Sequence, residues 1–208
     1  MNTIKRIISF LQIPRGILHI LLLITSPVRP VIEKDVERWL QETASPEQSR
    51  LPKWRNLVWL LWKCPAFRNL FYYRIAREER ITSRILVELA KIFFKPMDSL
   101  YIYTPTIGPG LFIQHGFSTI ISARSIGENC WINQQVTIGF SNLTDTPTIG
   151  DGVRITAGAQ VFGNITIGNN SIIGANAVVF KDVPPNCTVV GVPGYIVKCE
   201  GQKVRKPL

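Results

Sequence analysis

The sequence is poor in the residues from which metal sites and disulfide frameworks are built. Its 208 residues include two histidines, and none of its four cysteines forms a C-x-x-C pair or has a histidine at ligand spacing. This pattern indicates neither a zinc site nor a disulfide framework. We therefore expect no metal, and we expect the reduced, packed thiols of a cytoplasmic protein. The cysteines are Cys64, Cys130, Cys187 and Cys199.

An apolar run long enough to cross a membrane is also missing. Residues 7–10 and 17–24 are strongly apolar, but Pro14, Arg15 and His19 interrupt the stretch, and a spanning helix needs about 20 consecutive apolar residues. No A-x-A cleavage site follows it. Two short helices are therefore expected. Residues 1–30 either contact the inner face of a membrane peripherally, or they bury a helical core or a subunit interface.

Acidic residues are scarce, with 14 Asp and Glu against 24 Lys and Arg, and the net charge of +10 is unevenly placed. Residues 101–197 hold 3 basic and 4 acidic side chains. A nucleic-acid-binding protein concentrates Lys and Arg on its folded binding surface, and this sequence does not. No nucleic acid is therefore expected as a partner. The basic first half suits an anionic membrane surface or a phosphorylated ligand instead.

The first half of the chain has the pattern of helices separated by prolines. Apolar residues recur at helical spacing, and residues 43–52 form a polar loop bounded by proline. Residues 1–98 are thus expected to form an α-helical N-terminal region. The predicted helices cover residues 31–42, 54–62, 67–76 and 81–94.

A six-residue period replaces the helical one after residue 106. Large aliphatic residues recur every six positions from Ile149 to Val179, and the period extends backward with one extra residue between Ile113 and Ile120. A helix requires a period of about 3.6 and an open strand a period of about 2, so neither fits alone. The series is Ile107, Ile113, Ile120, Ile126, Ile132, Ile138, Ile149, Ile155, Val161, Ile167, Ile173 and Val179.

A six-residue period is typical of a parallel β-helix, in which each hexad forms a short strand and a turn. A mainly β fold of this kind is expected over residues 99–197, because a β-sandwich would give irregular strand spacing. Between Ile138 and Ile149 the spacing rises to eleven, so residues 140–148 are expected to leave the prism as a projecting loop. Residues 198–208 are expected to form a basic C-terminal tail.

Residues 107–197 resemble the hexapeptide-repeat acyltransferases, in the branch of the serine acetyltransferases and their exopolysaccharide relatives of the colanic acid type. The resemblance implies a left-handed β-helix and a homotrimer, with a dimer of trimers left open. It also implies that acetyl-CoA binds as co-substrate in clefts between neighbouring prisms. The segments that carry it are IGPGLFIQHGFSTII at 107–121, IGDGVRITAGAQVFGNITIGNNSIIGANAVV at 149–179 and VPPNCTVVGVPGYIV at 183–197.

His115 matches the catalytic histidine of that family, which implies a general base. A hydroxyl acceptor is a poor nucleophile until its proton is removed, and imidazole in general titrates near neutral pH. The family usually carries Asp before this histidine and a second His in the projecting loop, where this sequence has Gln114 and Thr146. Either Asp98 or Asp145 could take over the missing acidic role, and the sequence leaves that choice open.

Ala157 and Ala175 fall where the family presents small residues, so that the pantetheine arm of acetyl-CoA can run along the coil and pair with backbone groups. Gly163 and Lys181 are further candidates for the same cleft. The alternative is that the alanines simply pack at a tight corner of the prism. The C-terminal cations either meet the CoA phosphates or belong to a solvated tail; they are Lys198, Lys203, Arg205 and Lys206.

The sequence therefore predicts an acetyl-CoA-dependent O-acetyltransferase. The first half is short, apolar and basic like that of the sugar-acetylating relatives, which favours a hydroxyl on a sugar of a cell-surface polysaccharide precursor as the acceptor. The alternative is a serine O-acetyltransferase of cysteine biosynthesis. A second alternative, motivated by the missing Asp and His, is a non-catalytic trimeric scaffold.

Overall fold

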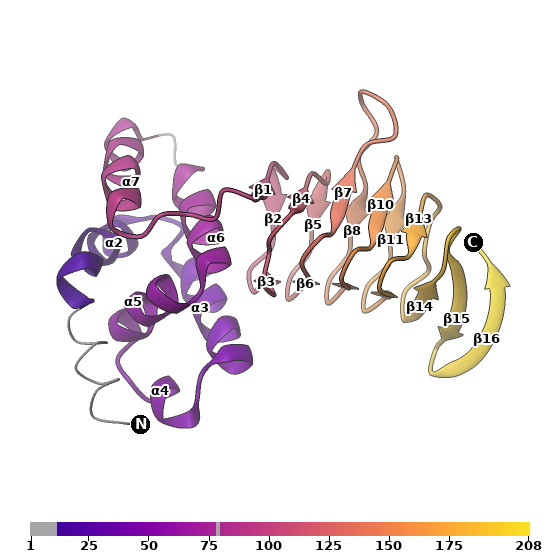
Figure 1. The fold of residues 1–208 in the computed structure, drawn as a ribbon, viewed down its shortest axis with the longest axis horizontal. Coiled ribbons are helices and arrows are strands. Elements are labelled where there is room, and N and C mark those ends of the chain that lie inside the picture. The colour runs from indigo at the N-terminus through magenta and orange to yellow at the C-terminus, as the bar shows by residue number, and fades with distance from the viewer. Residues whose placement is uncertain (1–11, 78–79) are drawn as a thin grey trace. The chain divides into compact units, whose positions relative to one another are not determined.

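The computed structural model describes residues 12–77 and 80–208 and divides the chain into two compact units, Met1–Met97 and Asp98–Leu208 (Figure 1). The first unit is helical, and the second is a stack of short strands. The division falls one residue before the end of the predicted helical region. The apolar helix predicted at residues 7–10 lies outside the described residues.

Six helices form the described part of the first unit. Four of them carry proline at their first or second position, where the missing N–H costs no intrahelical bond and the φ angle is already helical. The four helices predicted over residues 31–94 are confirmed, with bounds shifted by at most two residues, and α4 is a short addition in the polar loop. The helices are α2 (Ile13–Thr25), α3 (Arg29–Thr43), α4 (Pro46–Ser49), α5 (Lys53–Lys63), α6 (Pro65–Ala76) and α7 (Ile81–Phe93).

The core of the helical unit is aliphatic and aromatic. Leu57 and Leu60 of α5 are fully buried, as is Phe67 of α6. The ring of Trp39 in α3 packs edge-on against Phe67, with ring centroids 5.3 Å apart. Complete burial of side chains of this size contributes about 1.5–3 kcal/mol each, so α3, α5 and α6 are held together by their apolar faces.

Two groups of buried polar side chains in this core are hydrogen-bonded. Arg74 donates two hydrogen bonds, of 2.8 and 3.2 Å, to the buried carboxylate of Asp35. The Tyr72 hydroxyl donates to the Phe94 carbonyl oxygen and lies 2.8 Å from His19 Nε2. Burial lowers the pKa of His19 to about 4, so this imidazole is neutral at physiological pH.

The second unit is a parallel β-helix of five turns. Sheet A has the order β1-β4-β7-β10-β13, sheet B β2-β5-β8-β11, and sheet C continues β3-β6-β9-β12-β14 into β15 and β16. Each turn contributes one strand to each sheet, and Val183 extends sheet B by a bridge to Ile167. The strands are β1 (Leu100–Ile102), β2 (Thr106–Ile107), β3 (Phe112–Ile113), β4 (Thr119–Ile121), β5 (Ser125–Ile126), β6 (Trp131–Ile132), β7 (Thr137–Gly139), β8 (Thr148–Ile149), β9 (Arg154–Ile155), β10 (Gln160–Phe162), β11 (Thr166–Ile167), β12 (Ile172–Ile173), β13 (Val178–Val179), β14 (Cys187–Val190), β15 (Tyr195–Cys199) and β16 (Gln202–Pro207).

The interior of the β-helix is a stack of aliphatic side chains, and here the structure corrects the predicted register. Ile120 is 40% exposed, whereas Ile121 is fully buried and pairs with Ile138 of the next turn. The inward residue of β4 is therefore Ile121, which follows Ile113 by eight positions, so the first turn holds two extra residues instead of one. The other predicted positions are all buried: Ile107, Ile113, Ile126, Ile132, Ile138, Ile149, Ile155, Val161, Ile167, Ile173 and Val179.

The C-terminal residues, for which the sequence predicts a basic tail, form strands. β15 and β16 are antiparallel strands that continue sheet C beyond β14. Cys187 and Cys199 lie opposite each other in the β14–β15 ladder and form a disulfide, which corrects the expectation of reduced thiols. Their proximity depends on the hairpin register, which cysteine spacing does not reveal. Cys64 and Cys130 are free thiols, and burial raises the pKa of Cys130 to about 12.

Candidate active site

One corner of the β-helix is regular except in its first turn. At this corner, the C–A corner, the chain passes from sheet C to sheet A by a short corner turn, once in each turn of the β-helix. The second, third and fourth of these corner turns consist of residues 133–135, 156–158 and 174–176. The last residue of each has a left-handed backbone, with φ of 60° at Gln135, 71° at Gly158 and 57° at Asn176. A Cβ at Gly158 would lie 2.1 Å from Asn176 Oδ1, so a side chain there would displace the Asn176 amide.

His115 lies on an insertion in the first turn of the C–A corner. That turn has five residues, 114–118, where the later turns have three. The backbone N–H of Gln135 donates to the carbonyl oxygen of Phe117 at 3.0 Å, which aligns the end of both turns and leaves His115 and Gly116 as the extra pair. Their φ angles are 65° and 71°. The pair has no counterpart in the next turn; the His115 side chain is exposed and Gly116 is buried.

The residue before His115 is held by an amide of the next turn. Asn133 Nδ2 donates to Gln114 Oε1 at 2.8 Å. At Gln114, where the family that this sequence resembles usually carries Asp, this chain therefore has a neutral pair of amides. The pair fixes the start of the insertion but brings no charge to the imidazole of His115.

The structure brings the segment that carries Asp98 to the same corner as His115. The backbone N–H of Thr119, at the end of the His115 turn, donates to the carbonyl oxygen of Ser99 at 3.0 Å. Asp98 precedes Ser99 and is exposed. Leu100, two residues after Asp98, is buried with 4% exposure.

Asp145 lies in the projecting loop, residues 140–147, which leaves the prism between β7 and β8 as predicted (Figure 1). Its carboxylate accepts hydrogen bonds from the Ser141 hydroxyl at 2.5 Å and from the backbone N–H groups of Ser141 and Asn142 at 2.9 and 2.8 Å. The Ser141 hydroxyl, followed by the Asn142 N–H, holds the pKa of Asp145 below its usual value. The carboxylate therefore organises the loop.

The loop and His115 belong to different corners of one prism. The loop forms the third turn of the A–B corner, which leads from sheet A to sheet B, whereas His115 is in the first turn of the C–A corner. A single chain therefore does not bring Asp145 and His115 together, whereas it does bring His115 and the Asp98 segment to one corner.

Ala157 and Ala175 share the C–A corner with His115. The backbone N–H of Asn176 donates to the Ala157 carbonyl oxygen at 2.9 Å, which aligns the two alanines in successive turns. Ala175 is exposed and Ala157 is half-buried. This corner therefore carries an alanine in its third and fourth turns, where an extended ligand could approach the backbone.

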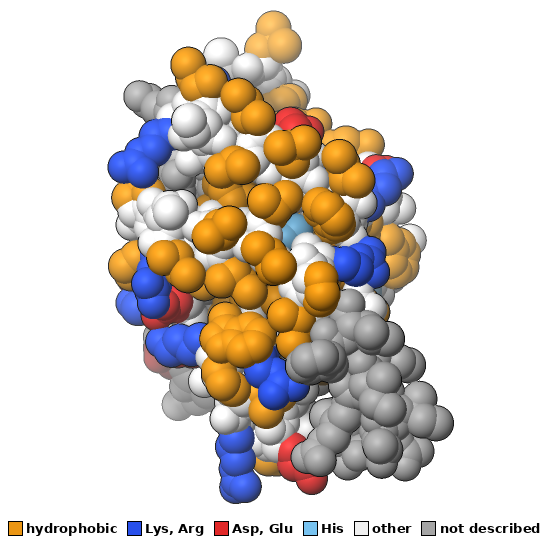
Figure 2. All heavy atoms as spheres, turned by 90° about the vertical axis from the view of Figure 1, so that its left-hand side faces the viewer, with side chains coloured by type: hydrophobic (Ala, Val, Ile, Leu, Met, Phe, Trp, Pro, Cys, Tyr) orange, Lys and Arg blue, Asp and Glu red, His pale blue; other side chains and the backbone are white. Residues whose placement is uncertain are grey.

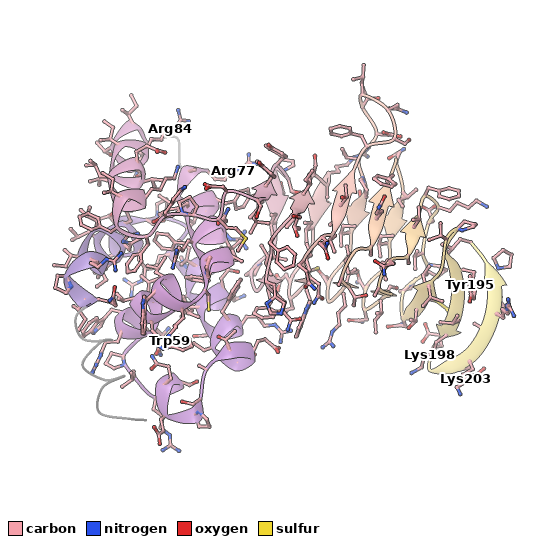
Figure 3. The ribbon with its side chains drawn as sticks, in the orientation of Figure 1. Trp59, Arg77, Arg84, Tyr195, Lys198 and Lys203 are labelled. Atoms are coloured by element: carbon pink, nitrogen blue, oxygen red, sulfur yellow. A yellow bond between two sulfur atoms is a disulfide. The ribbon has the colours of Figure 1, made fainter. Side chains whose placement is uncertain are left out.

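Gly163 and Lys181 lie instead on the A–B corner. Gly163 is buried at the base of the projecting loop, with a φ of 92°, and a Cβ there would lie 3.6 Å from Asp145 Oδ2. Lys181 Nζ donates to the Leu208 carbonyl oxygen at 2.7 Å, beside a pocket of about 410 Å³. Figure 3 shows Tyr195, a pocket residue, with Lys198 and Lys203 at the same end of the β-helix. The pocket is lined by Val178, Phe180, Lys181, Val192, Pro193, Gly194, Tyr195, Pro207 and Leu208.

The sequence pattern does not single out two residues that position candidate site residues. Asn133 fixes Gln114, and Ser141 fixes Asp145. The signal for Asn133 is its place one coil after Gln114, and the signal for Ser141 is a serine four residues before an aspartate in a loop. Within the described ranges, no group of three or more His, Cys, Asp or Glu residues is arranged to hold a metal.

Comparisons with known proteins fit this geometry. Residues 146–181 match the family described as bacterial transferase hexapeptide (six repeats). The chain is 36% identical over 165 residues to the serine acetyltransferase of Synechococcus elongatus, over 74% of this chain and 66% of that protein. It is 49% identical over 104 residues to that of Staphylococcus xylosus, over 48% of each. The crystal structure of Neisseria gonorrhoeae serine acetyltransferase aligns with a TM-score of 0.62 at 29% identity, over 86% of this chain and 69% of that chain.

These matches confirm the left-handed parallel β-helix and correct the predicted acceptor. The relatives are serine acetyltransferases, which overturns the prediction of a sugar acceptor and of the exopolysaccharide branch and favours the serine alternative. Part of the apolar first half, which favours a sugar acceptor at the level of sequence, lies in the buried core of the helical unit. The chain spans less than two thirds of the length of the two curated relatives, 66% and 48%.

Proposed function

For a chain that carries the bacterial transferase hexapeptide repeat and is homologous to serine acetyltransferases, we propose acetyl transfer from acetyl-CoA to the hydroxyl of L-serine. The observation that carries the proposal is the two-residue insertion His115-Gly116, which displays an imidazole on a corner whose other turns lack the extra residues. A rigid β-helix has no structural need of this insertion.

His115 is proposed as the general base. Its imidazole takes the proton of the serine hydroxyl while the oxygen attacks the thioester carbonyl, and backbone or side-chain donors stabilise the developing oxyanion. The carbon–sulfur bond then breaks, and the proton passes from the imidazolium to the departing thiolate. The products are O-acetylserine and free CoA, with no proton gained or lost overall.

Asp98 is proposed as the carboxylate that supports this step. Gln114 is neutral and bonded to Asn133, and the Asp145 carboxylate is occupied by Ser141 and Asn142 within its loop. The Asp98 segment meets the His115 turn through the Ser99–Thr119 backbone bond. A carboxylate near the imidazole orients it and stabilises the imidazolium formed during proton transfer.

The acetyl-CoA cleft is proposed to lie between two chains of a homotrimer. Ala157 and Ala175 are on the C–A corner, and Gly163 and Lys181 are on the A–B corner. These corners face different directions on one prism, so a cleft that uses both requires a neighbouring copy. Pantetheine would run along the small residues of one chain while the projecting loop of the next closes the cleft.

The experiment that tests this proposal is the release of free thiol from acetyl-CoA with L-serine as the acceptor. We expect rapid release that depends on serine and a product with the mass of O-acetylserine. Slow hydrolysis that ignores serine would contradict the serine acceptor. If, in addition, saturating acetyl-CoA left the melting temperature unchanged, a non-catalytic scaffold would replace the enzyme in this account.

A further inference from the structure

Helices α2 and α7 pack against each other and present a continuous apolar face on the helical unit. Figure 2, viewed from the side where these helices lie in Figure 1, shows hydrophobic side chains gathered across it. Each residue of this α2–α7 face is between 40% and 75% exposed. The residues are Ile17, Leu21, Ile24, Ile81, Ile85, Leu89, Ile92 and Phe93.

The α2–α7 face is not the core-facing side of its helices. In α7 the buried positions are Ser83, Val87 and Ala90, which at 100° per residue lie on a different side from Ile85 and Ile92. α7 is therefore apolar on two sides, a pattern of helices that are covered on both. Its charged residues form one narrow strip: Arg84, Glu88 and Lys91.

Cations lie at both ends of this face. Arg15 donates to the carbonyl oxygen of Phe93, and Arg80 donates to that of Thr25 at 3.5 Å. Each arginine thus binds the C-terminus of the opposite helix, so the two helices are antiparallel with an arginine at each end. Figure 3 shows Arg84 on α7 and Arg77 on the chain before it.

Acidic groups are few on these helices. α2 and α7 together contain three basic residues and a single acidic one, Glu88. Glu88 already accepts a hydrogen bond from Lys91 at 2.6 Å. Glu78 and Glu79, which precede α7 in the sequence, lie outside the described residues.

We propose that the α2–α7 face binds the surface of an anionic bilayer. Its centre is aliphatic and its cations lie at the margins, which is the arrangement of helices that lie in the membrane interface beside anionic headgroups. A second copy is disfavoured because a two-fold contact would bring one positive margin against another. A protein partner is disfavoured because interfaces between proteins also contain hydrogen bonds in their interior, and this centre offers few donors.

The contact would lie on the bilayer and not across it. Among residues 12–77 and 80–208, no helix is both long and apolar enough to span a membrane. α2 and α7 have 13 residues each, and helices of that length are about 20 Å long. This inference does not depend on the proposed enzymatic function.

The test is flotation of the full-length protein with phosphatidylcholine vesicles, with and without phosphatidylglycerol. We expect binding to the anionic vesicles, roughly tenfold weaker binding to the neutral ones, and weakening by salt. The variant Ile81→Gln with Ile92→Gln, at positions 73% and 75% exposed, should lose roughly tenfold in binding. Arg84→Glu, which leaves every apolar residue in place, should also lose binding to anionic vesicles.

The matched control is Phe140→Gln with Leu143→Gln, at positions 54% and 96% exposed in the β-helix unit; its vesicle binding should equal that of the wild type. Absence of wild-type binding to anionic vesicles would overturn the inference, as would unchanged binding of the Ile81 and Ile92 variant. If that variant instead reduced the mass of the assembly while no protein bound vesicles, the face would be a contact between copies of this chain.

Discussion

The two histidines of the chain differ in exposure: His19 is buried and His115 is exposed. His115 is exposed on its insertion, where it can reach a substrate. His19 is enclosed by the rings of Phe71, Tyr72 and Phe94, with centroids 5.2–5.8 Å from its own. Burial lowers the pKa of His19 to about 4, so its chemistry is that of a neutral core residue.

This burial predicts an acid-dependent loss of stability. The folded pKa of His19 is about 4 and its ordinary value is 6.5, so between these values the unfolded chain binds the proton and the folded chain does not. The free energy of unfolding should therefore have its full value above pH 6.5 and decrease as the pH is lowered toward 4. This one group accounts for about 3 kcal/mol over that window.

Urea unfolding of the wild type and of His19→Phe, measured near pH 7 and near pH 4.5, checks the assignment. The phenylalanine variant keeps an aromatic ring in the site but has no group to protonate. Its difference in stability between the two pH values should be smaller than that of the wild type. An equal difference in both proteins would assign the acid sensitivity to another group.

At the scale of the element, the first turn of the C–A corner contains two more residues than the later turns of that corner. The later turns show that three residues suffice between Ile132 and Val136, and His115 and Gly116 are additional to that number. Removal of this pair should leave Gln114, Phe117 and Ser118 as an ordinary three-residue turn.

Deletion of residues 115–116 should therefore remove acetyl transfer and keep the fold. We expect a melting temperature within about 5 °C of the wild type and no serine-dependent thiol release. The control is deletion of residues 134–135 in the next turn, which has no residues to spare and should unfold the β-helix. A large loss of stability on deleting 115–116 would show that the insertion is structural.

The sequence predicts much of this architecture because the six-residue period repeats one geometric unit. The helices, the β-helix and the projecting loop follow from it and from helical spacing. The register of β4 does not, because Ile120 and Ile121 are adjacent and equally apolar, and the choice depends on pairing with Ile138. The Cys187–Cys199 pair likewise depends on long-range register. His115 was identified through resemblance, since one exposed histidine has no distinctive spacing.

At the scale of the whole molecule, the candidate residues are divided between two corners of the prism. His115, Ala157 and Ala175 lie on the C–A corner, and the projecting loop lies on the A–B corner. We propose a cyclic trimer in which the C–A corner of each prism lies against the A–B corner of its neighbour. Each site would then combine the base of one chain with the loop of another.

Complementation between inactive variants tests this arrangement. Deletion of residues 141–145 restores the six-residue spacing between Ile138 and Ile149 and should inactivate the enzyme by removing the loop. His115→Ala should inactivate it by removing the base. A random equal mixture of the two chains should regain about a quarter of the wild-type activity, because each mixed trimer has one productive interface in three and about three quarters of the trimers are mixed. No recovery in proven mixed trimers would place the whole site within one chain.

The central claim, that His115 is the base of an acetyl transfer, is tested most directly by the turnover of His115→Ala with acetyl-CoA and L-serine. The account predicts that the rate falls by roughly 10²–10⁴-fold, while acetyl-CoA still raises the melting temperature and the oligomer keeps its mass. Wild-type turnover in His115→Ala would contradict the account.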